Sequence, residues 1–155
     1  MSVKLIKVTA QDVETVWKMQ VQAFQGLLAT YHDDDISPAT DTLSRVEERF
    51  AQPETTYYFI EAEGVRVGVI RVIDRNDGSR KRISPLWIME EYRGKGYAQD
   101  AMKRAEEIHG KNNWCLDTIL QEKGNIHLYE KMGYHQTGRI DHIKEGMDIV
   151  YYEKD

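Results

Sequence analysis

Cysteine is almost absent from this sequence, and long apolar runs are missing altogether. Cys115 is the single cysteine among 155 residues, so no disulfide can form within the chain. It stands in an apolar run, where we expect it to pack as a small hydrophobic group; the alternative, a nucleophile, is disfavoured because buried thiols are usually inert. No segment has the roughly 18 consecutive apolar residues of a membrane span, and residues 1–10 lack the apolar stretch of a signal peptide. These absences predict no membrane partner and a cytoplasmic location.

Positive charge is outnumbered by negative charge. The chain has 21 Lys and Arg against 26 Asp and Glu, which gives a formal net charge of -5. A mildly acidic protein has no overall attraction for nucleic acid, so we expect no nucleic-acid partner. A small anion needs only local donors and is not excluded, and an acidic surface favours a cationic substrate. The five histidines are scattered without the spacing of metal ligands, so we expect no metal.

The composition is that of a folded globular domain, with 41% hydrophobic and 30% charged residues. A chain of this length can bury a sizeable core without disulfides or metals. Linkers, internal repeats and low-complexity tracts are missing. We therefore predict a single domain over residues 1–155.

Hydrophobic periodicity and turn signals predict seven strands and four helices. The strands are expected over residues 3–8, 55–62, 65–73, 82–89, 114–120, 134–139 and 147–153. The helices are expected over residues 13–28, from Ser37-Pro38 to before Pro53, over 96–108 and over 125–132. Because hairpins stand beside strand–helix–strand units, the class is α/β (α+β in some schemes) with a mixed sheet. Pro85 lacks a backbone donor, which argues against full pairing of the strand over 82–89.

The loop Arg93-Gly94-Lys95-Gly96-Tyr97-Ala98 joins a predicted strand to a predicted helix. The first N–H groups of a helix have no internal partner and lie at the positive end of its dipole, so they can bind a phosphate. Glycine lets a ligand approach the backbone, and Arg93 and Lys95 add positive charge at the rim. The alternative is an ordinary surface turn that caps a helix. Dinucleotide-binding and P-loop fingerprints are both excluded: Gln99 replaces the third glycine of the former, and the Gly-Lys-Ser/Thr ending of the latter is missing.

A second motif is the predicted helix over 125–132, which contains Tyr129 and ends at Gly133. One interpretation is a short packing helix with a core tyrosine. The other is that the Tyr129 hydroxyl points into a cleft as a proton donor, since a neutral tyrosine, with a reference pKa of about 10, can protonate a leaving thiolate near pH 7.

Together these motifs resemble a known family. A strand followed by Arg93-x-x-Gly96-x-Ala98 and a helix is similar to motif A of the GNAT N-acetyltransferase superfamily. After one further strand, Leu128-Tyr129-Glu130-Lys131-x-Gly133-Tyr134 is similar to its motif B. The resemblance implies an acyl-CoA N-acyltransferase fold with a mixed, mostly antiparallel sheet of about seven strands and about four helices. It also implies that the fourth and fifth strands splay apart, which would explain Pro85.

The same resemblance implies the cofactor and its contacts. Acetyl-CoA would be the co-substrate, with its pantetheine paired to the backbone of Ile88 and Met89 and its pyrophosphate on the amides of residues 93–98. Tyr129 would also contact the cofactor and protonate the departing thiolate. Many relatives carry an asparagine seven residues before this tyrosine, where Glu122 stands here. Asn125 is the nearby residue that would replace this contact.

The implied reaction is N-acetylation of a primary amine by direct attack, through a tetrahedral intermediate, with Tyr129 as general acid. A backbone N–H near Ile88 would stabilise the oxyanion. Glu61 or Asp117 would serve as the base, and the alternative for each is a solvated strand carboxylate. A non-catalytic coenzyme A-binding module is the alternative function.

The acceptor and the oligomeric state are less constrained. The loop with Tyr31, His32 and Asp33 lies between two predicted helices, in a segment that helps form the acceptor site in relatives; the alternative is a solvated acidic loop. The acceptor would be a small-molecule, peptide or protein amine. Residues 147–152 are apolar on both faces of their strand, which a homodimer or the protein's own helices would cover.

Overall fold

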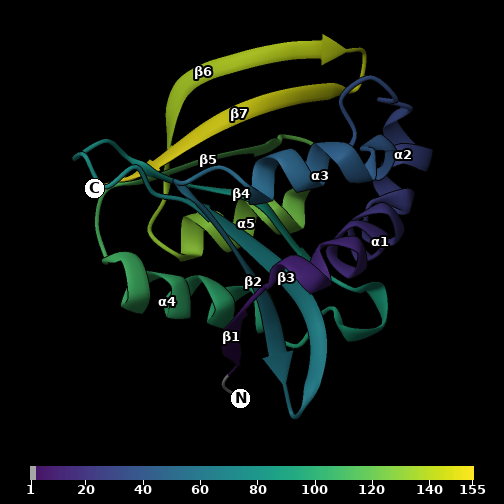
Figure 1. The fold of residues 1–155 in the computed structure, drawn as a ribbon. Helices are drawn as coiled ribbons and strands as arrows, with labels where there is room; N and C mark the ends of the chain where they lie inside the picture. The colour runs from purple at the N-terminus through teal and green to yellow at the C-terminus, as the bar shows by residue number, and fades with distance from the viewer. Residues whose placement is uncertain (1–2) are drawn as a thin grey trace.

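The computed structural model describes residues 3–155, which form one seven-stranded sheet in the order β1-β2-β3-β4-β5-β7-β6 (Figure 1). All neighbouring strands are antiparallel except β4 and β5, which are parallel. The strands are β1 Lys4–Lys7, β2 Thr55–Ala62, β3 Val65–Ile73, β4 Lys81–Ile88, β5 Trp114–Ile119, β6 His135–Lys144 and β7 Met147–Lys154. The α-helices are α1 Val13–Ala23, α2 Gln25–Tyr31, α3 Leu43–Phe50, α4 Tyr97–His109 and α5 Lys123–Lys131. The predicted mixed, mostly antiparallel sheet is confirmed.

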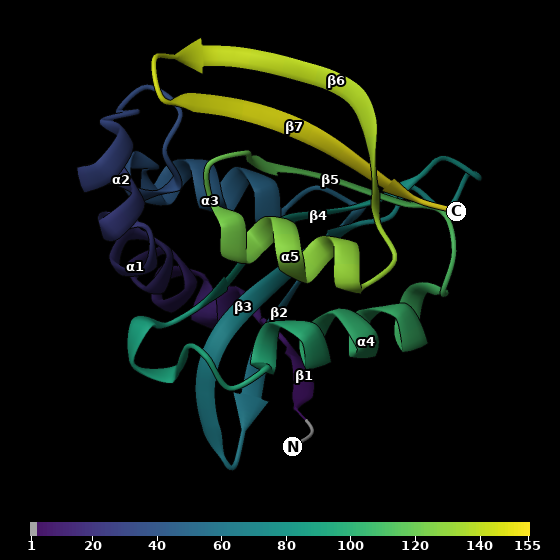
Figure 2. The same cartoon turned by 180° about the vertical axis from the view of Figure 1, so that it is seen from behind.

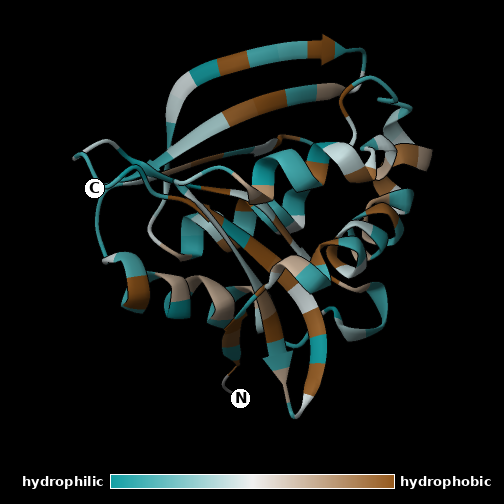
Figure 3. Ribbon diagram, in the orientation of Figure 1, coloured by the Kyte–Doolittle hydropathy of each residue, from teal (hydrophilic) through white to brown (hydrophobic). Residues whose placement is uncertain are grey.

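Helices cover both faces of the sheet. Successive residues of a strand point to opposite faces, and the aromatic run of β2 follows this rule. Tyr58 and Ile60 pack in the core beneath α4 and α5, whereas Tyr57 and Phe59 pack in the core beneath α1 and α3. Figure 2 shows α4 and α5 on their side of the sheet, and Figure 3 shows apolar residues concentrated in the central strands.

The strands β4 and β5 pair only at their beginning, through Lys81 with Trp114 and Arg82 with Cys115. The expectation that the strand with Pro85 is incompletely paired is therefore confirmed. Beyond Arg82 the two strands diverge, and one edge of β4 has no strand beside it. This opening in the middle of the sheet positions the site described below.

The N-terminal helices differ from the prediction. The single helix expected over residues 13–28 is broken at Phe24 into α1 and α2, which raises the number of α-helices from four to five. The predicted start at Ser37 is only a single 3-10 turn over Pro38–Thr40, and α3 begins later, after the N-cap Thr42. Periodicity missed the break because Phe24 and Leu27 keep helical spacing across it. The start was misplaced because Ser37-Pro38 caps only the short 3-10 turn.

The strand β7 lies inside the sheet, between β5 and β6. Its Val150 and Tyr152 side chains are buried in the core, while Ile149 and Tyr151 line a cavity on the opposite face. One apolar face of this strand is therefore covered by the protein's own core, and the other lines the cavity. Among residues 3–155, no helix is long and apolar enough to cross a membrane.

Candidate active site

The start of α4 presents main-chain N–H groups for which residues 3–155 provide no described acceptor. The N-cap Gly96 makes no side-chain capping bond. The first hydrogen bond of this turn is donated by Asp100 to the Gly96 carbonyl, and within residues 3–155 the N–H groups of Gly94–Ala98 have no described partner. These donors lie at the positive end of the helix dipole, so they form a site for a phosphate.

Glycine is required at two positions of this loop. Gly94 and Gly96 have φ angles of 80° and 81°, a conformation that side chains with a Cβ disfavour. A Cβ at either position would have no atom within 4 Å, so the space beside the loop is open. Tyr97 is buried in the core and anchors the first turn. The loop therefore combines free N–H donors and open space with a first helical turn that is anchored in the core.

The Arg93 side chain does not serve as free charge at the loop's rim, as the sequence led us to expect. Its Nε donates to the carbonyl of Ile88 (2.8 Å) and its Nη2 to the carbonyl of Ala23 (3.0 Å), and its main-chain N–H donates to Glu90. Arg93 thus ties the end of α1 to the end of β4. The exposed Lys95 remains beside the free amides.

The end of β4 offers one unused donor to the opening in the sheet. The Met89 N–H donates to Val67 of β3, and the Met89 carbonyl accepts from Tyr92. Main-chain groups of successive residues point to opposite edges of a strand, so the Ile88 N–H points toward the gap with β5. Of the two residues predicted to pair with the cofactor, Met89 has its main-chain groups engaged within the protein, and Ile88 is the one whose N–H points toward the opening.

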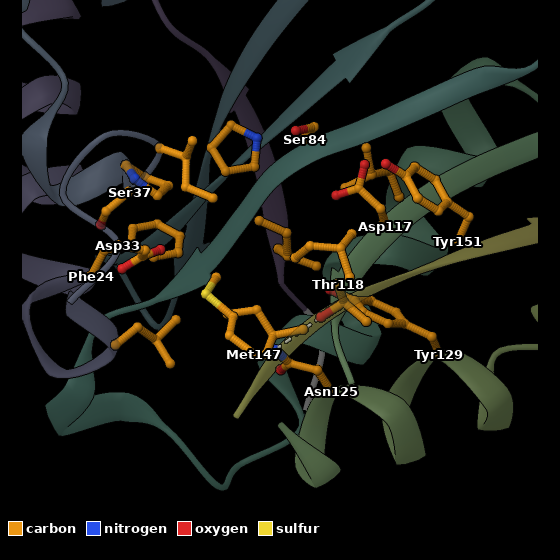
Figure 4. Close-up of a pocket in the computed structure, with 18 residues that line it drawn as sticks. Phe24, Asp33, Ser37, Ser84, Asp117, Thr118, Asn125, Tyr129, Met147 and Tyr151 are labelled. Carbon is orange, nitrogen blue, oxygen red and sulfur yellow. Dashed lines mark hydrogen bonds between the residues drawn. The ribbon is translucent and has the colours of Figure 1, made fainter. Parts of the chain in front are cut away.

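A cavity of about 370 Å³ occupies the divergence of β4 and β5 (Figure 4). Most of its wall is apolar, and its polar groups include Asp33, Asp117, Asn125 and Tyr129. The lining residues that the sequence did not predict come from α1 and α2, the 33–38 segment, β4, β5 and β7: Phe24, Leu27, Ile36, Ser37, Pro38, Ile83, Ser84, Pro85, Leu86, Thr118, Ile119, Met147, Ile149 and Tyr151. The alternation of Met147, Ile149 and Tyr151 was a usable sequence signal, but no pattern indicated that the 33–38 segment faces β5.

Tyr129 is buried except where it faces this cavity. Its side chain is 8% exposed and packs edge-on against Tyr134, and its hydroxyl makes none of the hydrogen bonds described for residues 3–155. Burial, and to a smaller extent the charge of Asp117, raise the pKa of Tyr129 to about 12. The hydroxyl is therefore protonated at neutral pH and free to donate.

Only one of the two candidate bases lies in the cavity. Asp117 lines it, and its Oδ2 accepts from Arg82 at 2.5 Å, which leaves Oδ1 without that partner. Glu61 pairs with Lys4 of β1 and Arg66 of β3, and it is not among the lining residues. Sequence alone could not tell which of these two carboxylates faces the cavity, because each occupies a polar position in a predicted strand.

The three predicted acceptor residues have different positions. Asp33 lines the cavity, and its buried Oδ1 has no hydrogen-bond partner. Tyr31 is buried, and its hydroxyl donates to Glu122. His32 is exposed at the C-cap of α2, with a φ of 51°. Tyr31 and His32 are not among the lining residues, so the structure brings only Asp33 to the site.

Asn125, on α5, lines the cavity beside Tyr129, and its Nδ2 donates to Thr118 Oγ1 at 3.4 Å (Figure 4). Cys115 is half-buried and lies outside the lining, and burial raises the pKa of its thiol. Among the residues that the structure describes, no group of three or more His, Cys, Asp or Glu side chains is arranged to hold a metal ion.

Residues 18–134 match the sequence model of the Acetyltransferase (GNAT) family. The chain belongs to this family. It is therefore an acyltransferase, and the resemblance of its two motifs to those of GNAT enzymes is confirmed.

Individual GNAT relatives agree with this assignment. The chain is 28% identical over 150 residues to the protein named Uncharacterized N-acetyltransferase YjgM of Escherichia coli K12, with 87% of each chain covered. It is 22% identical over 145 residues to spermidine N(1)-acetyltransferase of the same organism, with 91% of this chain and 77% of the relative covered.

A solved GNAT structure shows the same fold. The spermidine N-acetyltransferase of Vibrio cholerae, in complex with CoA and spermine, superimposes with a TM-score of 0.75 at 15% identity, over 97% of this chain and 94% of that chain. At this identity the similarity concerns the fold alone.

Proposed function

We propose that this GNAT protein transfers an acetyl group from acetyl-CoA to the primary amine of a small molecule. The observation that carries the proposal is the protonated Tyr129 hydroxyl in the cavity between β4 and β5. The main-chain N–H groups of Gly94–Ala98, which have no described partner, support it as a site for the cofactor's phosphates. The two spermidine N-acetyltransferases to which the chain is similar are named for the acetylation of an amine, which supports this class of acceptor.

The described residues fit coenzyme A. The amides of Gly94–Ala98, with Lys95 beside them, would hold the pyrophosphate. The Ile88 N–H would pair with the pantetheine arm in the gap between β4 and β5, and Asn125 would contact the cofactor from α5. When bound, acetyl-CoA supplies an activated acetyl thioester to the cavity.

The acceptor enters as an ammonium ion, because the reference pKa of an alkylamine is about 10.4. The buried, unpartnered Oδ1 of Asp33 is the acceptor-side anchor for this cation. The apolar wall of the cavity accommodates a hydrocarbon chain. Asp117, whose Oδ1 is left open beside the Arg82 ion pair, receives the proton directly or through water.

The remaining steps use groups already in place. The free amine attacks the thioester carbon, while the Ile88 N–H stabilises the negative charge on the carbonyl oxygen. The C–S bond breaks and Tyr129 donates its proton to the departing sulfur. The proton that the nitrogen loses as the amide forms returns to Tyr129, directly or through water, so the hydroxyl is restored. No covalent enzyme intermediate is required because holding the two reactants together can itself supply several kcal/mol, an effect that reaches roughly 7–11 kcal/mol in the best-aligned cases.

Calorimetry with coenzyme A, followed by an acetyl-CoA assay of free thiol release, tests the proposal. The acceptors screened are alkylamines, diamines, amino acids and peptides. We expect coenzyme A to bind and at least one small amine to be turned over. Absence of coenzyme A binding would refute the site, and binding without transfer to any amine would favour the non-catalytic binding module.

We also propose that the chain is a single domain over its whole length and acts without a metal. One face of β7 is buried and the other lines the cavity, so a homodimer would form through another surface. The longer of the two edge strands, β6, is exposed along its length and is the surface we favour for such an assembly. Sedimentation analysis of the purified protein would decide this point.

A further inference from the structure

A second cavity, of about 210 Å³, adjoins the first. The two cavities share four lining residues, Ile36, Pro38, Ser84 and Pro85, so only a thin wall of the 33–38 segment and of β4 separates them. The charged residues around the second cavity are Arg45, Arg49, Arg71, Asp35 and Asp41. Its charge is therefore opposite in sign to that of the first cavity, whose charged lining residues are Asp33 and Asp117.

Arg71 is the unusual member of this set. It lies on β3 and is 8% exposed, yet it makes no ion pair with any carboxylate of residues 3–155. Its Nη1 donates to the Ser84 carbonyl (2.9 Å), and its Nη2 donates to Gln52 Oε1 (3.0 Å) and Thr55 Oγ1 (3.2 Å). Its Nε is buried without a partner. A buried cation with only neutral partners is costly unless an anion compensates it.

The acidic neighbour of Arg71 in this cavity is already engaged. Oδ2 of Asp41 accepts from Arg49 at 2.7 Å and from Gln20 Nε2 at 2.9 Å. Asp35, the other acid, is exposed. The cavity thus has three arginines and two aspartates. Arg71, which has no carboxylate partner, is the most buried of the three arginines.

Two further buried polar atoms lie unpartnered beside Arg71. One is the hydroxyl of Tyr57, the residue that pairs with Arg71 across β2 and β3; it lies near the Arg49 guanidinium, behind the residues that line the cavity. The other is Oε1 of Gln20, which lines the cavity and whose amide nitrogen is already donating to Asp41 and Pro38. Orphaned groups of this kind are rare in native interiors, and three of them together call for a polar ligand.

We propose that this second cavity binds a small oxyanion, a carboxylate or a phosphate, on the guanidinium of Arg71. The Arg71 Nε–H donates to its oxygens, and a protonated oxygen or a bound water donates to Gln20 Oε1. The oxyanion is either the acidic end of the amine acceptor, which reaches across the Ser84–Pro85 wall, or a separate ion.

Arg71 also supports the fold, because it donates a hydrogen bond to the Ser84 carbonyl. The test therefore measures anion binding directly, since a purely structural role of Arg71 would not affect that measurement. Phosphate is titrated into the wild-type protein at constant ionic strength, with saturating coenzyme A present so that the loop before α4 is occupied. The melting temperature and the ¹⁵N–¹H signal of the Arg71 side-chain Nε are followed. We expect phosphate to raise the melting temperature and to shift the Arg71 signal with one dissociation constant.

Variants locate the effect. Arg71→Gln should weaken phosphate binding by about tenfold or more, as loss of a charge-assisted hydrogen bond implies, and Arg71→Lys should weaken it less. Arg66→Gln removes a charge from the same strand at an exposed position and should leave binding within about twofold. If phosphate leaves the wild-type Arg71 signal unmoved, or stabilises Arg71→Gln as much as the wild type, the anion site does not exist.

A kinetic comparison identifies the source of the oxyanion, and this part alone rests on the proposed function. Linear ω-amino carboxylates are compared as acceptors with diamines of equal length. If the acidic end of the acceptor occupies the cavity, Arg71→Gln raises the KM of the amino carboxylate about tenfold or more and leaves the diamine unaffected. If the ligand is a separate ion, neither KM depends on Arg71, while phosphate still binds. If no amine is acetylated, the proposed function fails and the phosphate titration still decides the anion site.

Discussion

The hydroxyl of Tyr31 donates a hydrogen bond of 2.5 Å to Oε2 of Glu122, although the two residues are 91 positions apart in the sequence. Tyr31 ends α2, and Glu122 is the N-cap residue of α5. The bond therefore ties the segment that carries Asp33 to the helix that carries Tyr129. It also gives Glu122 a role of its own at the position where many relatives have an asparagine.

The first prediction concerns this bond. Tyr31→Phe should lower the free energy of unfolding by about 1.5–3 kcal/mol, the value of a hydrogen bond to a charged group. It should also raise the KM for the amine more than it lowers kcat, because Asp33 loses its support. Urea unfolding and steady-state kinetics measure both effects. In a double-mutant cycle with Glu122→Gln, strictly additive changes would show that the two side chains are not coupled.

The second prediction concerns the proton donor. Tyr129→Phe keeps the buried ring but removes the hydroxyl that faces the cavity, so kcat should fall by about ten- to a thousand-fold, in the range of general-acid catalysis. Tyr134→Phe is the matched control, because its hydroxyl is also buried but lies outside the lining of the cavity. Unchanged turnover in Tyr129→Phe would remove this residue from the mechanism.

The third prediction concerns pH. Burial, followed by the charge of Asp117, raises the pKa of Tyr129 to about 12, above the reference value of about 10. The folded state therefore holds this proton more tightly than the unfolded state. The resulting stability is fully present below pH 10 and is lost as pH rises toward 12.

Two measurements check this pH dependence. Urea unfolding between pH 9 and 12 should show wild-type stability falling with pH, and less steeply in Tyr129→Phe. In kinetics, kcat should show no loss assignable to Tyr129 up to about pH 10, because the acid remains protonated. A decrease in kcat below pH 10 that disappears in Tyr129→Phe would contradict the raised pKa.

The fourth prediction concerns the cofactor loop. Gly96→Ala should cost about 1–2 kcal/mol, because the φ of 81° is unfavourable for alanine, and should weaken coenzyme A binding because the free amides move. Gly78→Ala is the control, since Gly78 has a similar φ of 86° in the turn between β3 and β4. Calorimetry should show weaker coenzyme A binding only for Gly96→Ala. Equal affinity in both variants would place the cofactor elsewhere.

The fifth prediction concerns the acceptor. Asp33→Asn removes the charge of the unpartnered carboxylate in the cavity and should raise the KM for the amine by about tenfold or more, with little change in the KM for acetyl-CoA. Asp34→Asn removes the same charge from an exposed neighbour and should leave both KM values unchanged. Equal effects of the two variants would mean that the acidic loop acts only through its overall charge.

The fold was largely predictable from local patterns. The strands of the β2–β3 hairpin and the helix after the glycine loop lie within a few residues of their expected positions, because alternation, turn residues and apolar spacing are local signals. The break at Phe24 was not predictable, since the residues on both sides keep one helical spacing. The incomplete pairing of β4 was predictable from Pro85, which cannot donate a hydrogen bond.

By itself, the sequence determined the glycine loop before α4 and the helix that carries Tyr129, because a helix start with glycines and a short helix followed by Gly133 are defined by neighbouring residues. Only the tertiary structure decided that Asp117 rather than Glu61 lies in the cavity, that Asp33 faces it while Tyr31 bonds to Glu122, and that Arg71 is buried without a carboxylate. These facts depend on contacts between residues far apart in the chain. Such contacts are set by how strands and helices pack against one another. The spacing of residues along the sequence does not specify that packing.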